Sequence, residues 1–158
     1  MTQDAARPDR RRLEKVLIAN RGEIAWRIVH AARELGIAAV GVYSEADARL
    51  PHLAACDEIA FIGPPPAAQS YLDMDRLVAT ALDYGCDCVH PGYGFLAENA
   101  TFARKVIAAG LVWVGPHPDA IDAMGDKIDS KRRMAEAGVP TVPGFTADLS
   151  RPAFNLEE

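Results

Sequence analysis

The stretch Lys15-Val-Leu-Ile-Ala-Asn-Arg-Gly-Glu-Ile-Ala-Trp-Arg-Ile28 decides the fold of this 158-residue chain. Residues 16–19 form a continuous apolar run, which is typical of a parallel strand that is covered on both faces. Residues 20–22 can form a turn. Apolar side chains then recur at helical spacing, at Ile24, Ala25, Ile28, Ala32 and Leu35. The stretch therefore predicts a buried strand that turns directly into a helix.

The turn argues against a phosphate-binding function for this unit. A loop that binds phosphate needs several glycines, so that backbone amides can approach the anion, and a free positive helix end. Here Gly22 is the single glycine, and Glu23 places a carboxylate beside the helix end. The unit is Rossmann-like in outline but lacks the Rossmann fingerprint. We therefore expect no affinity for NAD, which a stand-alone dinucleotide-binding domain would show.

The bulk properties indicate one globular domain. The chain is 49% hydrophobic with a formal net charge of -5, and this acidic balance gives no support to nucleic-acid binding. Its apolar runs are too short to span a membrane, so we predict neither nucleic acid nor membrane as a partner. The three cysteines form no disulfide framework, and Cys86 and Cys88 are expected to be a turn residue and a buried strand residue. We predict a reduced, cytoplasmic protein.

Strands and helices alternate along the chain. The expected strands are 15–20, 38–43, 59–62, 88–90 and 111–114, and the expected helices are 22–35, 51–54, 74–84, 96–109, 119–124 and 130–137. This alternation predicts an α/β fold with a doubly wound, mainly parallel sheet. Residues 1–14 are expected to be a flexible polar tail, 15–144 the domain, and 145–158 a linker or the start of a missing central domain.

Four loops are predicted at the carboxyl ends of strands, where open α/β sheets bind ligands: 20–23, 44–47, 90–99 and 115–118. The loop 90–99, HPGYGFLAEN, is the richest. Tyr93 lies between two glycines that let the backbone approach a ligand, and its phenol is a neutral donor at pH 7. We expect Tyr93 to contact a ligand and Phe95 to pack locally. His90 is equally compatible with a ligand contact and with satisfying a neighbouring carbonyl, and no nucleophile accompanies it.

Two further features are candidates for binding. Lys127 follows glycine at a segment boundary and is suited to reach a phosphate, although it also fits the solvated face of a basic helix. In the helix 22–35, Trp26, Arg27, His30 and Glu34 lie away from the apolar stripe. We expect this face to contact a partner, while the alternative is that Trp26 covers a loop of its own domain.

Taken together, six segments make the chain resemble the N-terminal domain of biotin carboxylase, the ATP-grasp component of acyl-CoA carboxylases and of pyruvate carboxylase. They occur in the family's order and spacing: KVLIANRGEIAWRI at 15–28, SYL at 70–72, HPGYGFLAEN at 90–99, WVGP at 113–116, MGDKIDSK at 124–131 and AGVPTVPG at 137–144. The resemblance implies a Rossmann-like, pre-ATP-grasp domain of an enzyme that carboxylates carrier-bound biotin with ATP and bicarbonate, through carboxyphosphate.

The resemblance also implies roles for particular residues and partners. Lys127 matches the lysine that touches the nucleotide phosphates, and Tyr93 and Gly94 match the loop near biotin and bicarbonate. Arg27, His30 and Glu34 match the dimer contact, with His30 in a place often held by arginine. The full-length enzyme is expected to use ATP with Mg²⁺ or Mn²⁺ and carrier-bound biotin. Its expected partners are a second copy, a biotin carboxyl carrier protein or domain, and a carboxyltransferase subunit.

In the family, a glycine-rich lid, metal-binding carboxylates and an arginine that supports biotin and bicarbonate follow this domain. None of these features is found in this sequence. Phosphoryl chemistry needs metal ions and positioned cations around the phosphates, so we expect no catalytic residue and no metal ligand here. The chain alone is predicted to be inactive and to bind none of these molecules tightly. The alternative is a non-catalytic dimerisation or docking module, and a glycine-rich loop encoded soon after Glu158 would favour the enzyme.

Overall fold

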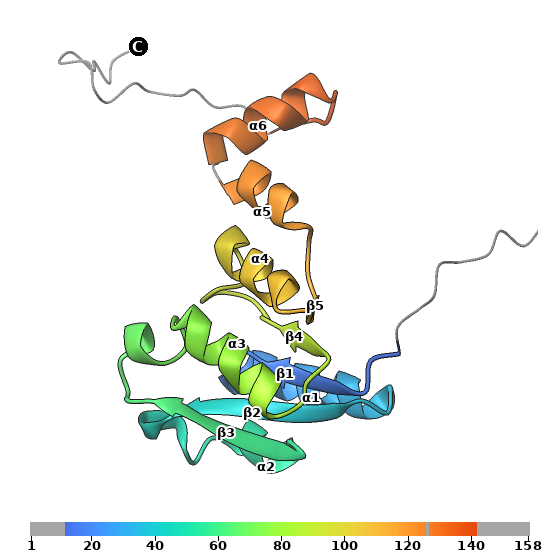
Figure 1. The fold of residues 1–158 in the computed structure, drawn as a ribbon. Helices are drawn as coiled ribbons and strands as arrows, with labels where there is room; N and C mark the ends of the chain where they lie inside the picture. Colours follow the sequence, from blue (N-terminus) through green and yellow to red (C-terminus); the bar gives the residue numbers. More distant parts are fainter. Residues whose placement is uncertain (1–11, 126, 142–158) are drawn as a thin grey trace, which may run out of the picture.

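A five-stranded parallel sheet forms the centre of the molecule (Figure 1). The structure is a computed structural model that describes residues 12–125 and 127–141. The strand order is β3-β2-β1-β4-β5, and all neighbouring strands pair in parallel. The strands are β1 (Lys15–Ile18), β2 (Ala38–Ser44), β3 (Glu58–Gly63), β4 (Cys88–His90) and β5 (Val112–Trp113). This confirms the predicted α/β fold with a doubly wound sheet.

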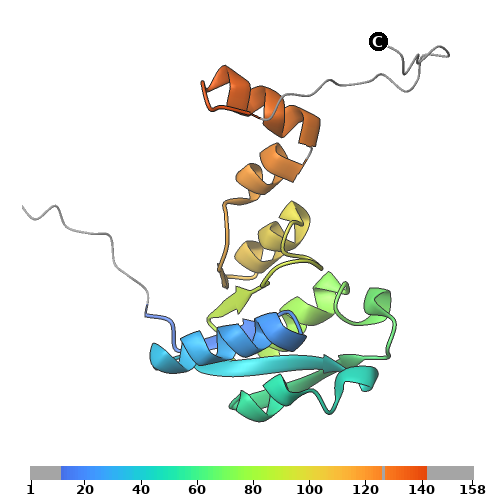
Figure 2. The same ribbon diagram turned by 180° about the vertical axis from the view of Figure 1, so that it is seen from behind.

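Helices cover both faces of the sheet. Helices α1 (Gly22–Glu34) and α2 (Pro51–Ala55) pack on one face, and α3 (Met74–Asp83) and α4 (Ala100–Ala108) pack on the other (Figure 1, Figure 2). Short 3-10 turns at Glu45–Asp47 and Ala67–Gln69 follow β2 and β3. The chain thus crosses from one face of the sheet to the other after β3.

The central strand β1 contributes to two separate cores. Leu17 belongs to the core under α3 and α4, whereas Val16 and Ile18 belong to the core under α1 and α2. Side chains alternate between the faces of a strand, so a strand that is buried on both faces needs apolar residues at every position. This explains the continuous apolar run in the sequence.

Helices α5 (Pro118–Gly125) and α6 (Lys127–Glu136) extend from the β5 end of the sheet, with α6 farther from the sheet in both views (Figure 1, Figure 2). Arg104 of α4 holds α5 by donating to Asp119 and Asp122 at 2.8 and 2.6 Å. By contrast, α6 contributes no buried residue among those that the structure describes. Among the described residues, α6 packs mainly against α5.

Some predicted boundaries were wrong. Helix α4 begins at Ala100 instead of Leu96, because Asn99 caps it by accepting a hydrogen bond from the Phe102 amide at 2.9 Å. Helix α6 begins at Lys127, three residues before the expected start. Leu13 packs against the α1 core, and the Glu14 amide donates to Asp87, so the fold includes two residues expected in the tail. Residues 1–11 of that tail and the expected linker at 145–158 lie outside the described residues.

The cysteines are free, as expected: Cys86 is buried just before β4 and Cys88 is buried within it. Within residues 12–125 and 127–141, no helix is long and apolar enough to cross a membrane.

Candidate functional site: the loop after β4

The loop between β4 and α4 begins where the strand order of the sheet reverses. Strand β1 pairs with β2 on one side and with β4 on the other. The chain adds β2 and β3 on one side of β1 and then returns to add β4 and β5 on the other side. Open α/β sheets bind ligands in the crevice at such a switch point, beyond the carboxyl ends of the strands. The loops that follow β1 and β4 therefore meet at the position expected for a binding site.

The side chain of Asn20, at the end of β1, holds the β4 loop by its backbone. Its Nδ2 donates to the carbonyl oxygens of Pro91 at 2.7 Å and of Tyr93 at 2.8 Å, while its Oδ1 accepts from the Arg21 amide at 2.9 Å. Asn20 is only 3% exposed. Gly92 lies against it so closely that a Cβ there would come within 2.9 Å of Nδ2 and of Ile24 Cγ1. The loop thus rests directly on the first turn of the chain.

Tyr93 is the exposed residue of this loop, with 62% of its surface accessible. Its hydroxyl donates to Glu23 Oε2 at 2.8 Å, and Arg27 pairs with the other carboxylate oxygen. These contacts, first with Tyr93 and then with Arg27, lower the pKa of Glu23, and the same carboxylate raises the pKa of Tyr93. The phenol is therefore neutral at pH 7 and its one O–H is donated to Glu23, so a ligand meets the exposed ring and the lone pairs of the phenol oxygen.

The loop then makes a left-handed turn. Gly94 has a φ of 67°, and Phe95 has a φ of 42°, which is uncommon for a residue with a side chain. The ring of Phe95 stacks on Tyr71 with centroids 5.0 Å apart and planes 9° apart, and the Arg21 guanidinium lies over both rings. Phe95 is thus packed locally, as predicted, and this packing stabilises the turn.

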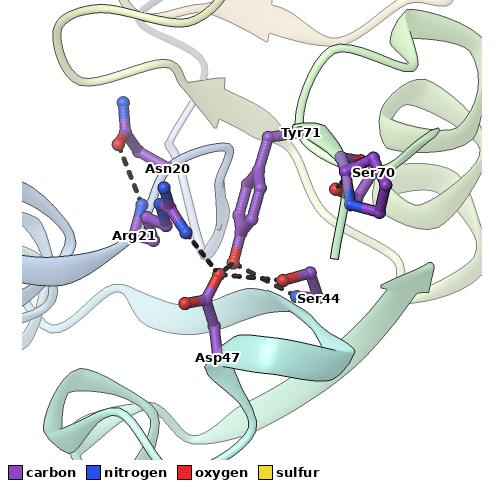
Figure 3. A network of polar contacts seen from close by, with 7 residues as sticks. Asn20, Arg21, Ser44, Asp47, Ser70 and Tyr71 are labelled. Atoms are coloured by element: carbon purple, nitrogen blue, oxygen red, sulfur yellow. Dashed lines mark hydrogen bonds and ion pairs between the residues drawn. The ribbon is translucent and has the colours of Figure 1, made fainter. Parts of the chain in front are cut away.

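Beneath these rings lies a buried polar network around Asp47, which the sequence analysis missed (Figure 3). One carboxylate oxygen accepts from Arg21 and Tyr71 at 2.8 Å and from the Ser44 hydroxyl at 2.9 Å. Burial raises the pKa of Asp47, but the hydrogen bonds from Arg21, Tyr71 and Ser44 outweigh it, so this pKa lies below its usual value. Burial also raises the pKa of Tyr71 to about 12. The network therefore joins the ends of β1 and β2 to the segment after β3.

His90 contacts the backbone of its own loop. Its Nδ1 accepts a hydrogen bond from the Gly92 amide at 3.1 Å, and burial lowers its pKa. The ring is therefore neutral at pH 7 and helps to close the start of the loop. The expected backbone partner was a carbonyl, whereas the observed partner is an amide donor, and a ligand contact of His90 stays a prediction.

The predicted partner face of α1 is exposed. Trp26, Arg27, His30 and Glu34 are all accessible, and the Trp26 and His30 rings lie against each other with centroids 4.8 Å apart. Arg27 pairs with Glu23 of its own helix. Beside this helix runs an apolar groove of about 400 Å³, lined by side chains of α1, by Cys88 and His90 of β4 and by Val114. The groove reaches His90 but is distinct from the Tyr93 loop.

Lys127 is the first residue of α6, and its side chain lies outside what the structure describes. Its predicted contact with nucleotide phosphates stays a prediction. Within the described ranges, no group of three or more His, Cys, Asp or Glu side chains is placed to hold a metal ion.

Comparison with known families identifies the chain. Residues 12–121 match the family model described as the biotin carboxylase N-terminal domain. The chain belongs to this family.

Individual relatives agree with the family match. The biotin carboxylase of Pseudomonas aeruginosa is 56% identical over 137 residues, which are 87% of this chain and 30% of that protein. The propionyl-CoA carboxylase alpha chain of Ruegeria pomeroyi is 53% identical, over 83% of this chain and 19% of its own length. The matched region is therefore about a third of the first relative and about a fifth of the second.

Solved structures of the family share the fold. The biotin carboxylase domain dimer of Hydrogenobacter thermophilus 2-oxoglutarate carboxylase, in complex with MgADP, ADP and bicarbonate, superposes with a TM-score of 0.79 at 49% identity. The match covers 84% of this chain and 29% of that one. This biotin carboxylase N-terminal domain thus corresponds to the first part of a larger fold.

The predicted site residues are brought together only in part. Tyr93 and Gly94 lie in the loop that the β1–α1 turn holds, and Arg27 reaches the same place through Glu23. Asn20 and Asp47 were not assigned, although both belong to loops expected at the carboxyl edge of the sheet. That shared edge was the signal that could have linked them, because parallel strands bring the residues after their carboxyl ends together.

Proposed function

We propose that this chain is the N-terminal domain of a biotin carboxylase, an ATP-dependent carbon–nitrogen ligase. The full-length enzyme transfers the γ-phosphoryl group of ATP to bicarbonate, which gives carboxyphosphate and ADP. A biotin nitrogen on the carrier protein then takes the carboxyl group, and phosphate leaves. The observation that carries this proposal is the Tyr93 loop, fixed on the Asn20–Glu23 turn at the switch point of the sheet in a chain of this family.

The loop contributes binding and orientation. Tyr93 and Gly94 lie beside biotin and bicarbonate, where the exposed phenol and the glycine backbone leave room for a small polar substrate. Lys127 provides a positive charge for the phosphates of ATP. Arg27, His30 and Glu34 on α1 form the contact with a second copy, since all three are exposed on the same helix.

The residues described here do not fit a metal site, because no group of metal-ligating side chains is assembled among them. The Mg²⁺ or Mn²⁺ that accompanies ATP is therefore assigned to the remainder of the enzyme. Carrier-bound biotin and a carboxyltransferase subunit are the expected partners. The free cysteines Cys56, Cys86 and Cys88 fit a reducing compartment, and we assign the protein to the cytoplasm on that ground.

The test is the transfer of label from bicarbonate to biotin in the presence of ATP. We expect turnover by a full-length protein that carries this sequence as its N-terminal domain, and none by residues 1–158 alone. Turnover by the chain alone would overturn the assignment of the chemistry to other parts of the enzyme. A full-length protein without activity, but with a chain that forms dimers, would instead favour a non-catalytic dimerisation module.

A further inference from the structure

Asn20 donates from its amide nitrogen to two backbone carbonyls of one loop of the proposed substrate site. We infer that Asn20 is a positioning residue, which orients the peptide between Tyr93 and Gly94 so that the Gly94 N–H faces the substrate. This inference rests on the proposed function for the identity of the substrate, and on the hydrogen bonds of Asn20 for the orientation of the peptide.

The orientation of the Asn20 carboxamide is fixed by its partners. The Pro91 and Tyr93 carbonyls can only accept, so the NH₂ group must face them, and each receives one of its two hydrogens. The Arg21 amide can only donate, so it requires the oxygen on the other side. Both ends of a side chain that is almost completely buried are thus matched, and no rotation of the amide preserves these bonds.

The direction of the Gly94 N–H follows from the geometry of the peptide group. The described residues contain no cis peptide, and in a trans peptide the C=O and the N–H point in opposite directions. Because the Tyr93 carbonyl points at Asn20, the Gly94 N–H points away from it. This N–H makes no hydrogen bond within the described part of the chain, and the space beside Gly94 is open. It is therefore a free donor for a carbonyl or carboxylate oxygen.

Other contacts of the loop cannot replace this one. The Tyr93–Glu23 hydrogen bond lies at the surface and constrains a side chain, and the stacking of Phe95 begins after the peptide in question. Only Asn20 bonds to the carbonyl of that peptide within residues 12–125 and 127–141. If Asn20 were only structural, its replacement would change stability alone. If Asn20 is a positioning residue, its replacement also changes the binding of the substrate that meets the loop.

The test compares Asn20→Asp with Asn99→Asp in the full-length protein. Asn20→Asp keeps the shape but turns a carboxylate oxygen toward two carbonyl oxygens. Asn99→Asp is the matched control, because the Asn99 side chain accepts a hydrogen bond at a helix N-cap, which aspartate does equally well. We expect Asn20→Asp to raise the KM for biotin or for bicarbonate roughly tenfold, equivalent to the loss of about one hydrogen bond, and to leave the KM for ATP unchanged.

The KM values for biotin and for bicarbonate show which of the two substrates accepts the hydrogen bond from the Gly94 N–H. An equal rise in the KM for ATP, or no change in any KM with the protein folded, would overturn the inference. If Asn20→Asp does not fold, Asn20→Ser replaces it, because serine keeps one hydrogen-bond donor. The KM values for biotin, bicarbonate and ATP of this variant then test the inference.

A second measurement separates this inference from the proposed function. In the ¹H–¹⁵N spectrum of the chain, Asn20→Ser should shift the Gly94 amide signal, and Asn99→Asp should not. If the Gly94 amide signal shifts but the full-length protein carboxylates no biotin, the proposed function is refuted and the inferred orientation of the Tyr93–Gly94 peptide stands. An unshifted Gly94 signal in the folded variant would refute the orientation itself.

Discussion

Asp47 is the charged side chain on which three loops of this domain converge. It is 7% exposed and accepts hydrogen bonds from Arg21, Ser44 and Tyr71. Asp47→Asn puts an amide in place of a carboxylate that three donors surround, so we expect a loss of about 1–3 kcal/mol in the free energy of unfolding. Urea denaturation measures it.

Asp75→Asn is the matched control for this prediction. Asp75 pairs with Lys105 at 2.5 Å, but its side chain is 82% exposed, so we expect a loss below about 1 kcal/mol. Equal losses in the two variants would show that the Asp47 network contributes no more than a surface ion pair.

His52 makes stability depend on pH. Neither ring nitrogen makes a hydrogen bond of ordinary geometry with the described residues, and burial lowers its pKa although Asp47 and the Val42 carbonyl oppose the shift. The unfolded chain, with a pKa near 6.5, therefore takes up a proton more readily than the folded one. Stability from the neutral ring is present above about pH 6.5 and falls as the pH drops toward the lower folded pKa.

The prediction is checked by measuring unfolding free energy from pH 7.5 down to 5 in the wild type and in His52→Met. The variant should show a shallower loss on acidification, because it removes one titrating group and keeps an apolar side chain of similar size. Parallel curves for the two proteins would contradict this explanation.

These residues could not be assigned from the sequence, because their partners are remote. Asn20 bonds to Pro91 and Tyr93, which lie 71 and 73 positions further along the chain. Asp47 bonds to Tyr71, which lies 24 positions further along. Tyr93, by contrast, stood out because two glycines flank it at the end of a strand. A local pattern can mark a loop as a site, but the side chains that hold the loop come from other elements.

At the level of elements, the strands and most helices were predictable from the sequence. Buried parallel strands consist of apolar runs, and aspartate is a favoured helix N-cap, the role that Asp73 has at α3. The start of α4 was not predictable, because Leu96 and Ala97 fit a helical pattern, while the turn before them depends on Phe95 stacking on Tyr71. The local sequence favours a helix there, and tertiary packing overrides it.

The contact between the β1–α1 turn and the β4 loop predicts a difference between two glycines. Gly92 and Gly94 both have a φ of 67°, so alanine is strained at either position. Only at Gly92 would the new Cβ also collide with Asn20 and Ile24, whereas the space at Gly94 is open. We expect Gly92→Ala to lower the unfolding free energy by about 1–3 kcal/mol more than Gly94→Ala. Equal effects, measured by urea denaturation, would show that the loop moves freely over the turn.

At the level of the whole molecule, the turn after β1 supports the loop after β4, which we propose meets the substrate. Asn20 bonds to the loop backbone, Arg21 covers the ring of Phe95, and Glu23 accepts from Tyr93. The nearby Arg27, on the proposed dimer face, shares Glu23 with the loop. The sequence argued against phosphate binding by this turn, and the structure shows that its side chains hold the neighbouring loop.

We propose that this domain presents the Tyr93–Gly94 backbone to the substrate of a biotin carboxylase. A crystal structure of the full-length protein with biotin, bicarbonate and ADP tests this proposal. We expect an oxygen of biotin or bicarbonate within hydrogen-bonding distance of the Gly94 N–H, with Asn20 still bonded to the Tyr93 carbonyl. Both substrates bound in the crystal without contact to residues 93 and 94 would contradict it.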